Sequence, residues 1–88
     1  MKPIRTGAGI EWKILTEEVL SLYKQGQYDR GVIVAKKALA VAEKNVEKNH
    51  PDVATSLVNM AELYRKTGRD KEAEALKKRA AANRVIQR

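Results

Sequence analysis

LYKQGQY at residues 22–28 returns later in the chain as LYRKTGRD at residues 63–70. Each copy has the residues expected where one helix ends, a glycine turns the chain and the next helix begins. Gly26 and Gly68 stand 42 residues apart. Because an internal period between about 20 and 50 residues is typical of stacked-repeat proteins, these two stretches predict two copies of one helical unit.

Length and composition limit the classes of protein to which the chain can belong. The 88 residues suffice for one domain with a modest core. There is no cysteine, which excludes disulfides, thiol catalysis and zinc sites built from thiolates. No apolar run approaches the roughly 18 residues that cross a membrane, and no signal peptide is visible. We therefore expect no membrane partner and a cytoplasmic protein, with an already removed signal peptide as the open alternative.

The net charge of +7 is concentrated near the C-terminus. Residues 65–88 hold nine lysines or arginines against three acids, so the rest of the chain is nearly neutral. One interpretation is a solvated helix face with cations near a helix C-terminus, which the helix dipole favours. The other is a surface that attracts nucleic acid or acidic partners.

Apolar spacing and helix-breaking residues predict four helices. Residues 1–9, with Pro3 and two glycines, show no periodicity and are expected to form a flexible arm. Gly26, Pro51 and Gly68 separate the periodic segments that follow, since glycine favours a helix C-terminus and proline a first turn. The predicted helices span residues 10–25, 28–48, 51–67 and 70–86.

Each predicted helix carries one apolar stripe, whose members recur every three or four positions and so share a face. In the first two helices the stripes are Trp12, Leu15, Val19 and Leu22, and then Tyr28, Val32, Ala35, Leu39, Ala42 and Val46. In the last two they are Val53, Leu57, Met60 or Ala61 and Tyr64, and then Ala73, Leu76 and Ala80 with Val85 or Ile86. Short turns make consecutive helices antiparallel neighbours, so we expect an all-α fold of two helical hairpins.

Two sets of residues give the chain a family resemblance. They are Leu15, Val19, Tyr23, Gly26, Tyr28, Gly31 and Ala38 in the first repeat, and Leu57, Ala61, Tyr64, Gly68, Ala73 and Ala80 in the second. In these residues the chain resembles the tetratricopeptide repeat (TPR) family, over roughly residues 12–83. Its period is 42 rather than the usual 34 residues. That period, with HPDVA at residues 50–54, is similar to the kinesin-light-chain type.

The resemblance implies two TPR hairpins stacked as a short right-handed α-solenoid within residues 10–88. Such arrays generally need three or more repeats to bury a continuous core, and this chain has two. The outer face of the first hairpin has no evident capping helix. We therefore expect the chain to form a homo-oligomer, most simply a dimer, either by stacking hairpins or by exchanging them between copies.

Two positions depart from the family pattern. Gly31 replaces an alanine where the helices of the first hairpin touch, which keeps a close approach at a cost of about 1 kcal/mol of helix propensity. Asp70 stands where an aromatic residue packs in the family. The second hairpin is therefore expected to be looser than the first.

The sequence does not predict an enzyme, a metal site or a cofactor site. His50, the one histidine, lies beside Pro51 at a helix start, where a structural role is favoured over catalysis. Glu17 and Glu18 are expected on an exposed helical turn. The GAG at residues 7–9 follows no predicted strand, so it is not a nucleotide-binding loop.

The resemblance implies that the first helix of each hairpin lines a concave groove, which holds an extended peptide or a helix. The candidate groove residues are Thr16, Leu20, Tyr23 and Lys24 from the first helix and Thr55, Asn59, Glu62 and Lys66 from the third. Groove-binding members use an asparagine at the position of Asn59 to hydrogen-bond the ligand backbone, and an amide both donates and accepts. Glu17 holds the equivalent position in the first repeat, so a two-sided clamp for a C-terminal carboxylate is not intact. The alternative for Asn59 is a surface amide without a ligand. The alternative for Leu20 and Tyr23 is packing against the first helix of the neighbouring hairpin.

Two hypotheses of function follow. The first is a protein-interaction and assembly module that binds a peptide, a helix or another copy of itself, through the groove or the open repeat ends. The second is binding of nucleic acid or an acidic surface through the basic helix at residues 70–86. Residues 65–88 contain no aromatic side chain for base stacking. That helix would therefore bind phosphates only, with a steep salt dependence.

Overall fold

Four α-helices form two consecutive hairpins. The computed structural model describes the backbone of residues 6–46 and 50–86 and the side chains of residues 9–46 and 50–82. The helices are α1 (Thr6–Lys24), α2 (Tyr28–Asn45), α3 (Pro51–Lys66) and α4 (Asp70–Ile86). The described residues form no strand, which confirms the predicted all-α fold class.

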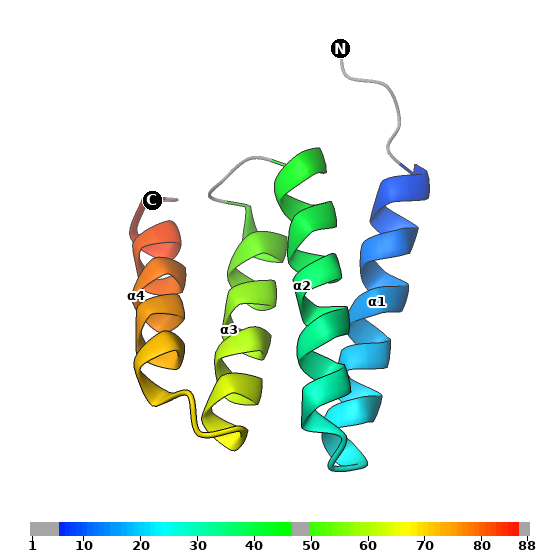
Figure 1. The fold of residues 1–88 in the computed structure, drawn as a ribbon. Helices are drawn as coiled ribbons and strands as arrows, with labels where there is room; N and C mark the ends of the chain where they lie inside the picture. Colours follow the sequence, from blue (N-terminus) through cyan, green and yellow to red (C-terminus); the bar gives the residue numbers. More distant parts are fainter. Residues whose placement is uncertain (1–5, 47–49, 87–88) are drawn as a thin grey trace.

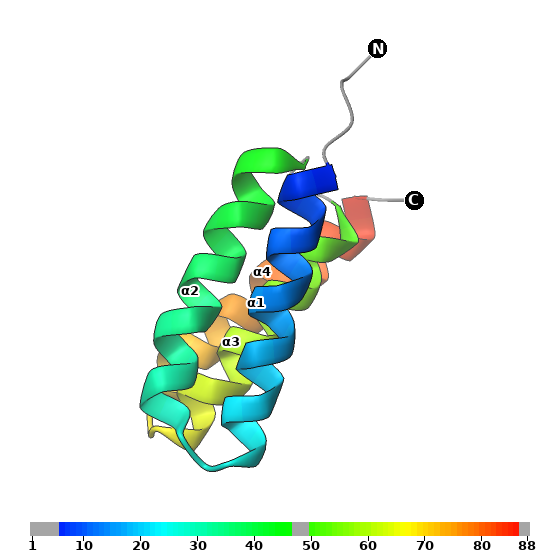
Figure 2. The same ribbon diagram turned by 90° about the vertical axis from the view of Figure 1, so that its right-hand side faces the viewer.

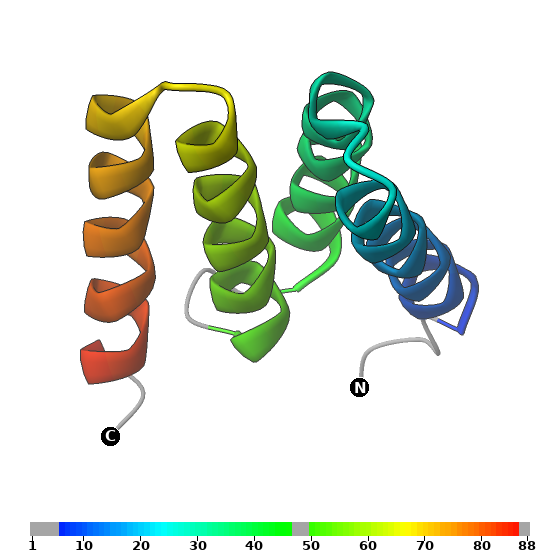
Figure 3. The same ribbon diagram turned by 90° about the horizontal axis from the view of Figure 1, so that it is seen from below.

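The helices alternate in direction and follow one another in a row from α1 to α4 (Figure 1). Seen along the row, the first hairpin lies in front of the second (Figure 2). Contacts between α1 and α2 and between α3 and α4 hold each hairpin together, and α2 packs against α3 to join them. From below, α1 and α3 lie toward one side of the row and α2 toward the other (Figure 3). Because α1 also touches α3, the first helices of the two hairpins share one side of this short solenoid.

Two helix bounds differ from the prediction by three residues or more, and the ends of α1 and α3 by one residue each. α1 begins at Thr6 rather than at residue 10, so the predicted flexible arm at residues 1–9 is helical over residues 6–9, and residues 1–5 lie outside the described residues. Glycine lowers helix stability without forbidding the helical backbone, which explains the early start. α2 ends at Asn45 rather than at residue 48, since Val46 is already extended, with φ of −133° and ψ of 168°.

Glycines close both hairpins. Gly26 and Gly68 have φ of +77° and +83°, in the left-handed region that side chains disfavour. The N–H groups of the next residues, Gln27 and Arg69, donate to helix carbonyls five residues back at 2.9 and 2.7 Å. These bonds satisfy carbonyls that a helix end leaves unpaired. The two copies of the repeated stretch therefore form turns of the same geometry.

The predicted apolar stripes form the core. Their buried members are Val19, Leu22, Val32, Ala35, Leu39, Ala42, Val53, Leu57, Met60, Ala61, Tyr64, Ala73 and Ala80. The side chains of Val85 and Ile86 lie outside the described residues. Ala54, Ser56 and Leu63 of α3 are also buried, although they lie outside its predicted stripe. Because α3 packs against both α2 and α4, more than one face of this helix is covered and a single stripe underestimates its burial.

The helix contacts do not distinguish the two hairpins, so a looser second hairpin stays a prediction. α3 contacts α4 at least as extensively as α1 contacts α2. In the first hairpin, Tyr28 packs edge-on against Tyr23, with ring centroids 5.5 Å apart. In the second, Asp70 is exposed, and the guanidinium of Arg69 instead lies 5.0 Å from the centroid of the Tyr64 ring. The family pattern places an aromatic residue at the position of Asp70. In this chain the neighbouring Arg69 makes a cation–π contact with Tyr64 at the same turn.

Gly31 marks a close approach between the hairpins. A β-carbon here would lie 2.9 Å from Cδ2 of Leu63 in α3, but 3.8 Å from Cβ of Leu22 in α1. The tighter neighbour of Gly31 thus belongs to α3 and not, as the sequence predicts, to the other helix of its own hairpin. Leu63 is fully buried, so in a closely packed interior its side chain has little room to move. The missing methyl group makes space for the second hairpin.

A hydrogen bond joins the hairpins a second time. The Trp12 indole Nε1–H donates to the Ser56 hydroxyl at 2.7 Å, which connects α1 to α3. Ser56 is only 3% exposed, so water is a poor substitute for this partner. The bond therefore fixes how α1 lies against α3.

We expect Gly31→Ala to change the free energy of unfolding differently in two backgrounds. In the native chain, a gain of about 1 kcal/mol in helix propensity is offset by the contact with Leu63. In a Leu63→Ala background, which itself costs about 2–5 kcal/mol, the same change stabilises the protein by about 1 kcal/mol. Urea unfolding of the four proteins measures this coupling. Equal effects in both backgrounds would show that Leu63 does not limit the space at Gly31.

Trp12→Phe is expected to lower the free energy of unfolding by about 1–3 kcal/mol, because it leaves the buried Ser56 hydroxyl without a donor. Thermal unfolding checks this, with Ser56→Ala as the matched background. Removing both partners costs less than the sum of the two single changes. The hydrogen bond is unimportant if Trp12→Phe costs as much in the Ser56→Ala background as in the native chain.

Candidate functional site

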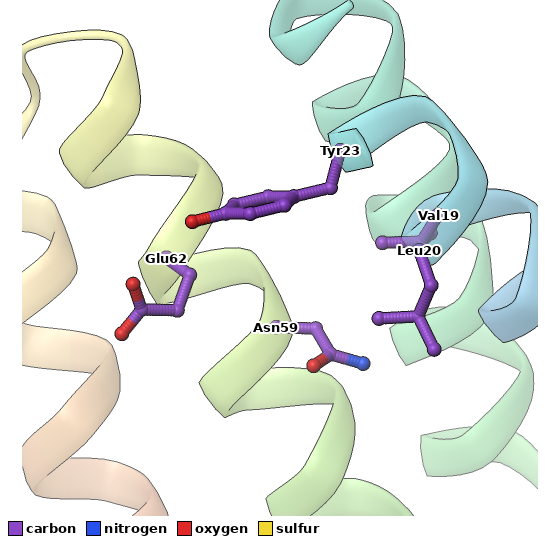
Figure 4. A pocket seen from close by; sticks show the side chains of 5 residues that line it. All are labelled: Val19, Leu20, Tyr23, Asn59 and Glu62. Atoms are coloured by element: carbon purple, nitrogen blue, oxygen red, sulfur yellow. The ribbon is translucent and has the colours of Figure 1, made fainter. Parts of the chain in front are cut away.

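A hollow of about 290 Å³ lies between α1 and α3 (Figure 4). Its walls are Val19, Leu20 and Tyr23 from α1 and Asn59 and Glu62 from α3. The Tyr23 ring reaches from α1 toward α3, and the Asn59 amide projects from α3 into the space between the two helices (Figure 4). The hollow is therefore mainly apolar on the α1 side and polar on the α3 side.

Helical spacing brings these side chains together. Leu20 and Tyr23 are three residues apart, as are Asn59 and Glu62, so each pair lies on one helix face. Val19 is 2% exposed and belongs to the core, whereas Leu20 is 47% exposed. The apolar wall therefore extends from the buried Val19 to Leu20, whose side chain is about half exposed to solvent.

Two lysines lie beside the polar parts of the hollow. Lys66 Nζ is 5.9 Å from the centroid of the Tyr23 ring, at the outer limit of a cation–π contact. Lys77 Nζ in α4 is 3.9 Å from Oε2 of Glu62, and these side chains are 36% and 42% exposed. An exposed ion pair contributes only about 0–1 kcal/mol. Glu62 can therefore exchange Lys77 for another partner at little cost.

Four of the eight predicted groove residues line the hollow, namely Leu20, Tyr23, Asn59 and Glu62. Lys66 adjoins it through Tyr23. Thr16, Lys24 and Thr55 do not line it. Lys24 and Thr55 are exposed, and the Thr16 hydroxyl is buried without a hydrogen-bond partner among the described residues. Binding of a ligand by any of the eight remains a prediction.

Val19 is the one lining residue that the sequence analysis assigns to the core alone. It lies at the boundary between core and hollow and serves both. Its spacing of four residues from Tyr23 is the signal that places it on the groove side. The Tyr23 ring contacts Tyr28 of α2 edge-on, with 5.5 Å between centroids. Because this contact lies within the first hairpin, packing of Tyr23 against the first helix of the second hairpin remains a prediction.

His50 begins α3 and faces no site. Its Nδ1 accepts a hydrogen bond from the Asp52 N–H at 3.0 Å, and Pro51 follows at the first helical position. This N-cap confirms the structural role predicted for the one histidine. The described residues contain no group of three or more His, Asp or Glu side chains arranged to hold a metal ion. None of the described helices is both long and apolar enough to cross a membrane.

Neighbouring carboxylates neutralise part of the basic face of α4. Arg79 pairs with Glu43 of α2, and Lys77 pairs with Glu62 of α3. Both pairs join partly exposed side chains and contribute little to stability. The alternative hypothesis, binding of nucleic acid or an acidic surface through residues 70–86, remains a prediction with fewer free cations than the sequence suggests.

The tetratricopeptide repeat family model matches residues 15–84, from the middle of α1 to near the end of α4. This chain belongs to the tetratricopeptide repeat family. Tetratricopeptide repeats generally mediate protein–protein interaction and assembly, and are typically non-catalytic. The kinesin-light-chain type remains a prediction, since the match does not distinguish it. No curated protein and no solved structure matched the chain.

In this TPR unit α1 and α3 are the first helices of the two repeats. The hollow therefore lies between first helices, the elements that the family resemblance assigns to the groove. Leu20 and Tyr23 come from the first repeat, and Asn59 and Glu62 from the second. The site thus depends on the packing of one repeat against the next.

His50→Ala is expected to lower the free energy of unfolding by about 0.5–2 kcal/mol, because it removes the side-chain acceptor at the start of α3. His50→Asn is the matched control, since asparagine caps helices well and keeps most of this stability. Thermal unfolding of both variants makes the comparison. An alanine variant as stable as the native chain would mean that the cap is not used.

Proposed function

We propose that the hollow between α1 and α3 binds an extended segment of a partner protein, with one apolar side chain of that segment inserted. The observation that carries this proposal is the placement of Leu20 and Asn59 on opposite walls of one hollow. Burial of the half-exposed leucine supplies affinity, at about 25 cal/mol per Å² of apolar surface. The amide supplies direction, because it both donates to and accepts from a peptide unit.

The hollow is large enough to take one side chain of a partner. Pockets for drug-sized ligands occupy about 300–1,000 Å³, and this hollow, at about 290 Å³, falls just below that range. The Asn59 amide favours an extended segment over a helix. A helix satisfies its own backbone N–H and C=O groups, whereas an extended segment leaves them free to bond an amide.

Charge beside the hollow favours an acidic partner. Lys66 and Lys77 adjoin the lining residues, and Lys24 is exposed next to Tyr23 in the chain. Against these cations the lining contains a single carboxylate, that of Glu62. A segment with acidic residues beside its apolar side chain matches this balance.

A display library of short peptides, each with one apolar residue between acidic residues, tests the proposal. We expect peptides selected on the native chain to bind Leu20→Lys and Asn59→Ala at least about tenfold more weakly, a loss of about 1.4 kcal/mol. Fluorescence anisotropy gives the affinities, and circular dichroism confirms unchanged helicity.

Ile33→Lys is the matched control for this experiment. Ile33 lies in α2, is 59% exposed and does not line the hollow. The Ile33→Lys substitution therefore makes the same change from an apolar to a cationic side chain as Leu20→Lys, at a comparable exposure. We expect it to leave the affinity for the selected peptides unchanged. Selected peptides that bind all three variants as tightly as the native chain would place the binding site elsewhere.

A further inference from the structure

The interface between α2 and α3 shows how one repeat packs on the next. The two helices run antiparallel (Figure 1), and Leu63 lies against Gly31. From this contact, we step three or four residues at a time in opposite directions along the two helices, which keeps to the facing sides. Positions that come to lie opposite each other across the interface are called level pairs. By this register the level pairs are Val32 with Leu63, Ala35 with Met60, Leu39 with Ser56 and Ala42 with Val53, and all eight residues are buried.

The 42-residue period carries this register to both ends of the molecule. α1 occupies the place of α3 one repeat earlier, and α4 the place of α2 one repeat later. The counterparts of the α3 face are Glu11, Ile14, Glu18 and Ser21 on α1. The counterparts of the α2 face are Glu74, Lys77, Ala81 and Arg84 on α4. We refer to these sets as the α1 end face and the α4 end face.

The described residues of both end faces lie at least partly open to solvent. Ile14 is 58% exposed, whereas its counterpart Ser56 in the second repeat is 3% exposed. Glu11 and Glu18 are exposed, and neither forms an ion pair within the described part of the chain. Ala81 is exposed as well. Among the described residues, the register positions that are buried between the repeats are therefore exposed or half-exposed at the ends.

We infer that copies of this chain stack head to tail, with the α1 end face of one copy on the α4 end face of the next, in the register of α3 on α2. The level pairs are then Glu11 with Arg84, Ile14 with Ala81, Glu18 with Lys77 and Ser21 with Glu74. Two pairs join opposite charges, one sets the exposed isoleucine on an alanine, and the last sets a hydroxyl beside a carboxylate. No level pair joins like charges. This complementarity identifies a second copy as the occupant of the faces.

The association does not use the Leu20 and Asn59 walls of the hollow, although Lys77 of the α4 end face adjoins the hollow through Glu62. The two faces differ, so the contact does not close on itself and copies add in a line. Ion pairs near the surface are weak and are screened by salt. Assembly is therefore dependent on protein concentration and on ionic strength, and it differs from an exchange of hairpins, which would not use these faces.

Multi-angle light scattering of the native chain over a wide concentration range is the first test. At about 50 mM salt the weight-average mass rises to at least twice that of the monomer, and at about 500 mM salt it returns toward the monomer, because the Debye length shortens. A native chain that stays monomeric at low salt overturns the inference. So does a discrete dimer that is insensitive to salt.

Charge reversal of each end face is the second test. Glu11→Lys with Glu18→Lys makes both faces basic, and Lys77→Glu with Arg84→Glu makes both acidic. Each double variant alone loses the rise in mass, whereas their equimolar mixture regains at least the twofold increase. A mixture that remains monomeric while both variants keep their helicity overturns the inference, as does self-association of either variant at the native level.

Two further variants guard against misleading outcomes. Lys36→Glu with Lys37→Glu, on exposed positions of α2, matches the charge change of the acidic variant but lies off both end faces, so it keeps the native rise in mass. Ile14→Lys alters an exposed residue and therefore spares the core, yet it removes the rise. Should reversal at Lys77 disturb its neighbour Glu62 and unfold the chain, Ile14→Lys decides the question alone, and native-like assembly of that variant counts against the stack.

Discussion

The structure depends on the close packing of Leu63 against the bare backbone of Gly31. A β-carbon at Gly31 would lie 2.9 Å from the Leu63 side chain, which is itself fully buried. This packing lets α2 and α3 approach, sets their register, and so brings α1 within reach of α3. The Trp12–Ser56 hydrogen bond and the hollow join the same two hairpins, on the side of α1 and α3. Glycine costs about 1 kcal/mol of helix propensity, and the cost is offset by the burial that the approach permits.

Much of the fold was predictable because its signals are local. Gly26 and Gly68 identified the turns, since a left-handed backbone almost requires glycine, and the apolar spacing identified the core faces. The prediction failed where tertiary contacts decide. Leu63 and Ser56 are buried because α3 is covered on more than one side, which the stripe of one helix does not reveal. The early start of α1 was missed since glycine weakens helix propensity without setting a boundary.

The candidate site was predictable only as far as repeat position reaches. Leu20, Tyr23, Asn59 and Glu62 occupy groove positions on the first helix of each repeat, and packing of the repeats brings them together. Lys77 could not be placed beside Glu62 from sequence, because it comes from α4 and its partner depends on how the second hairpin closes. The binding role of the four residues rests on their chemistry, an apolar wall facing an amide, and not on their proximity alone.

The end faces differ in the character of their residues from the interface between the two repeats. The register positions hold mainly apolar residues between α2 and α3, whereas five of the eight end-face residues are charged. Polar outer faces of this kind are what terminal repeats require. In the proposed stack, the acidic residues of the α1 end face lie level with basic residues of the α4 end face. The same charged residues would therefore disfavour unspecific apolar association and favour binding of a second copy. Each added copy would contribute another hollow between first helices. A partner with several suitable segments would then bind a stack more tightly than a single copy, because each further segment binds at a high effective concentration.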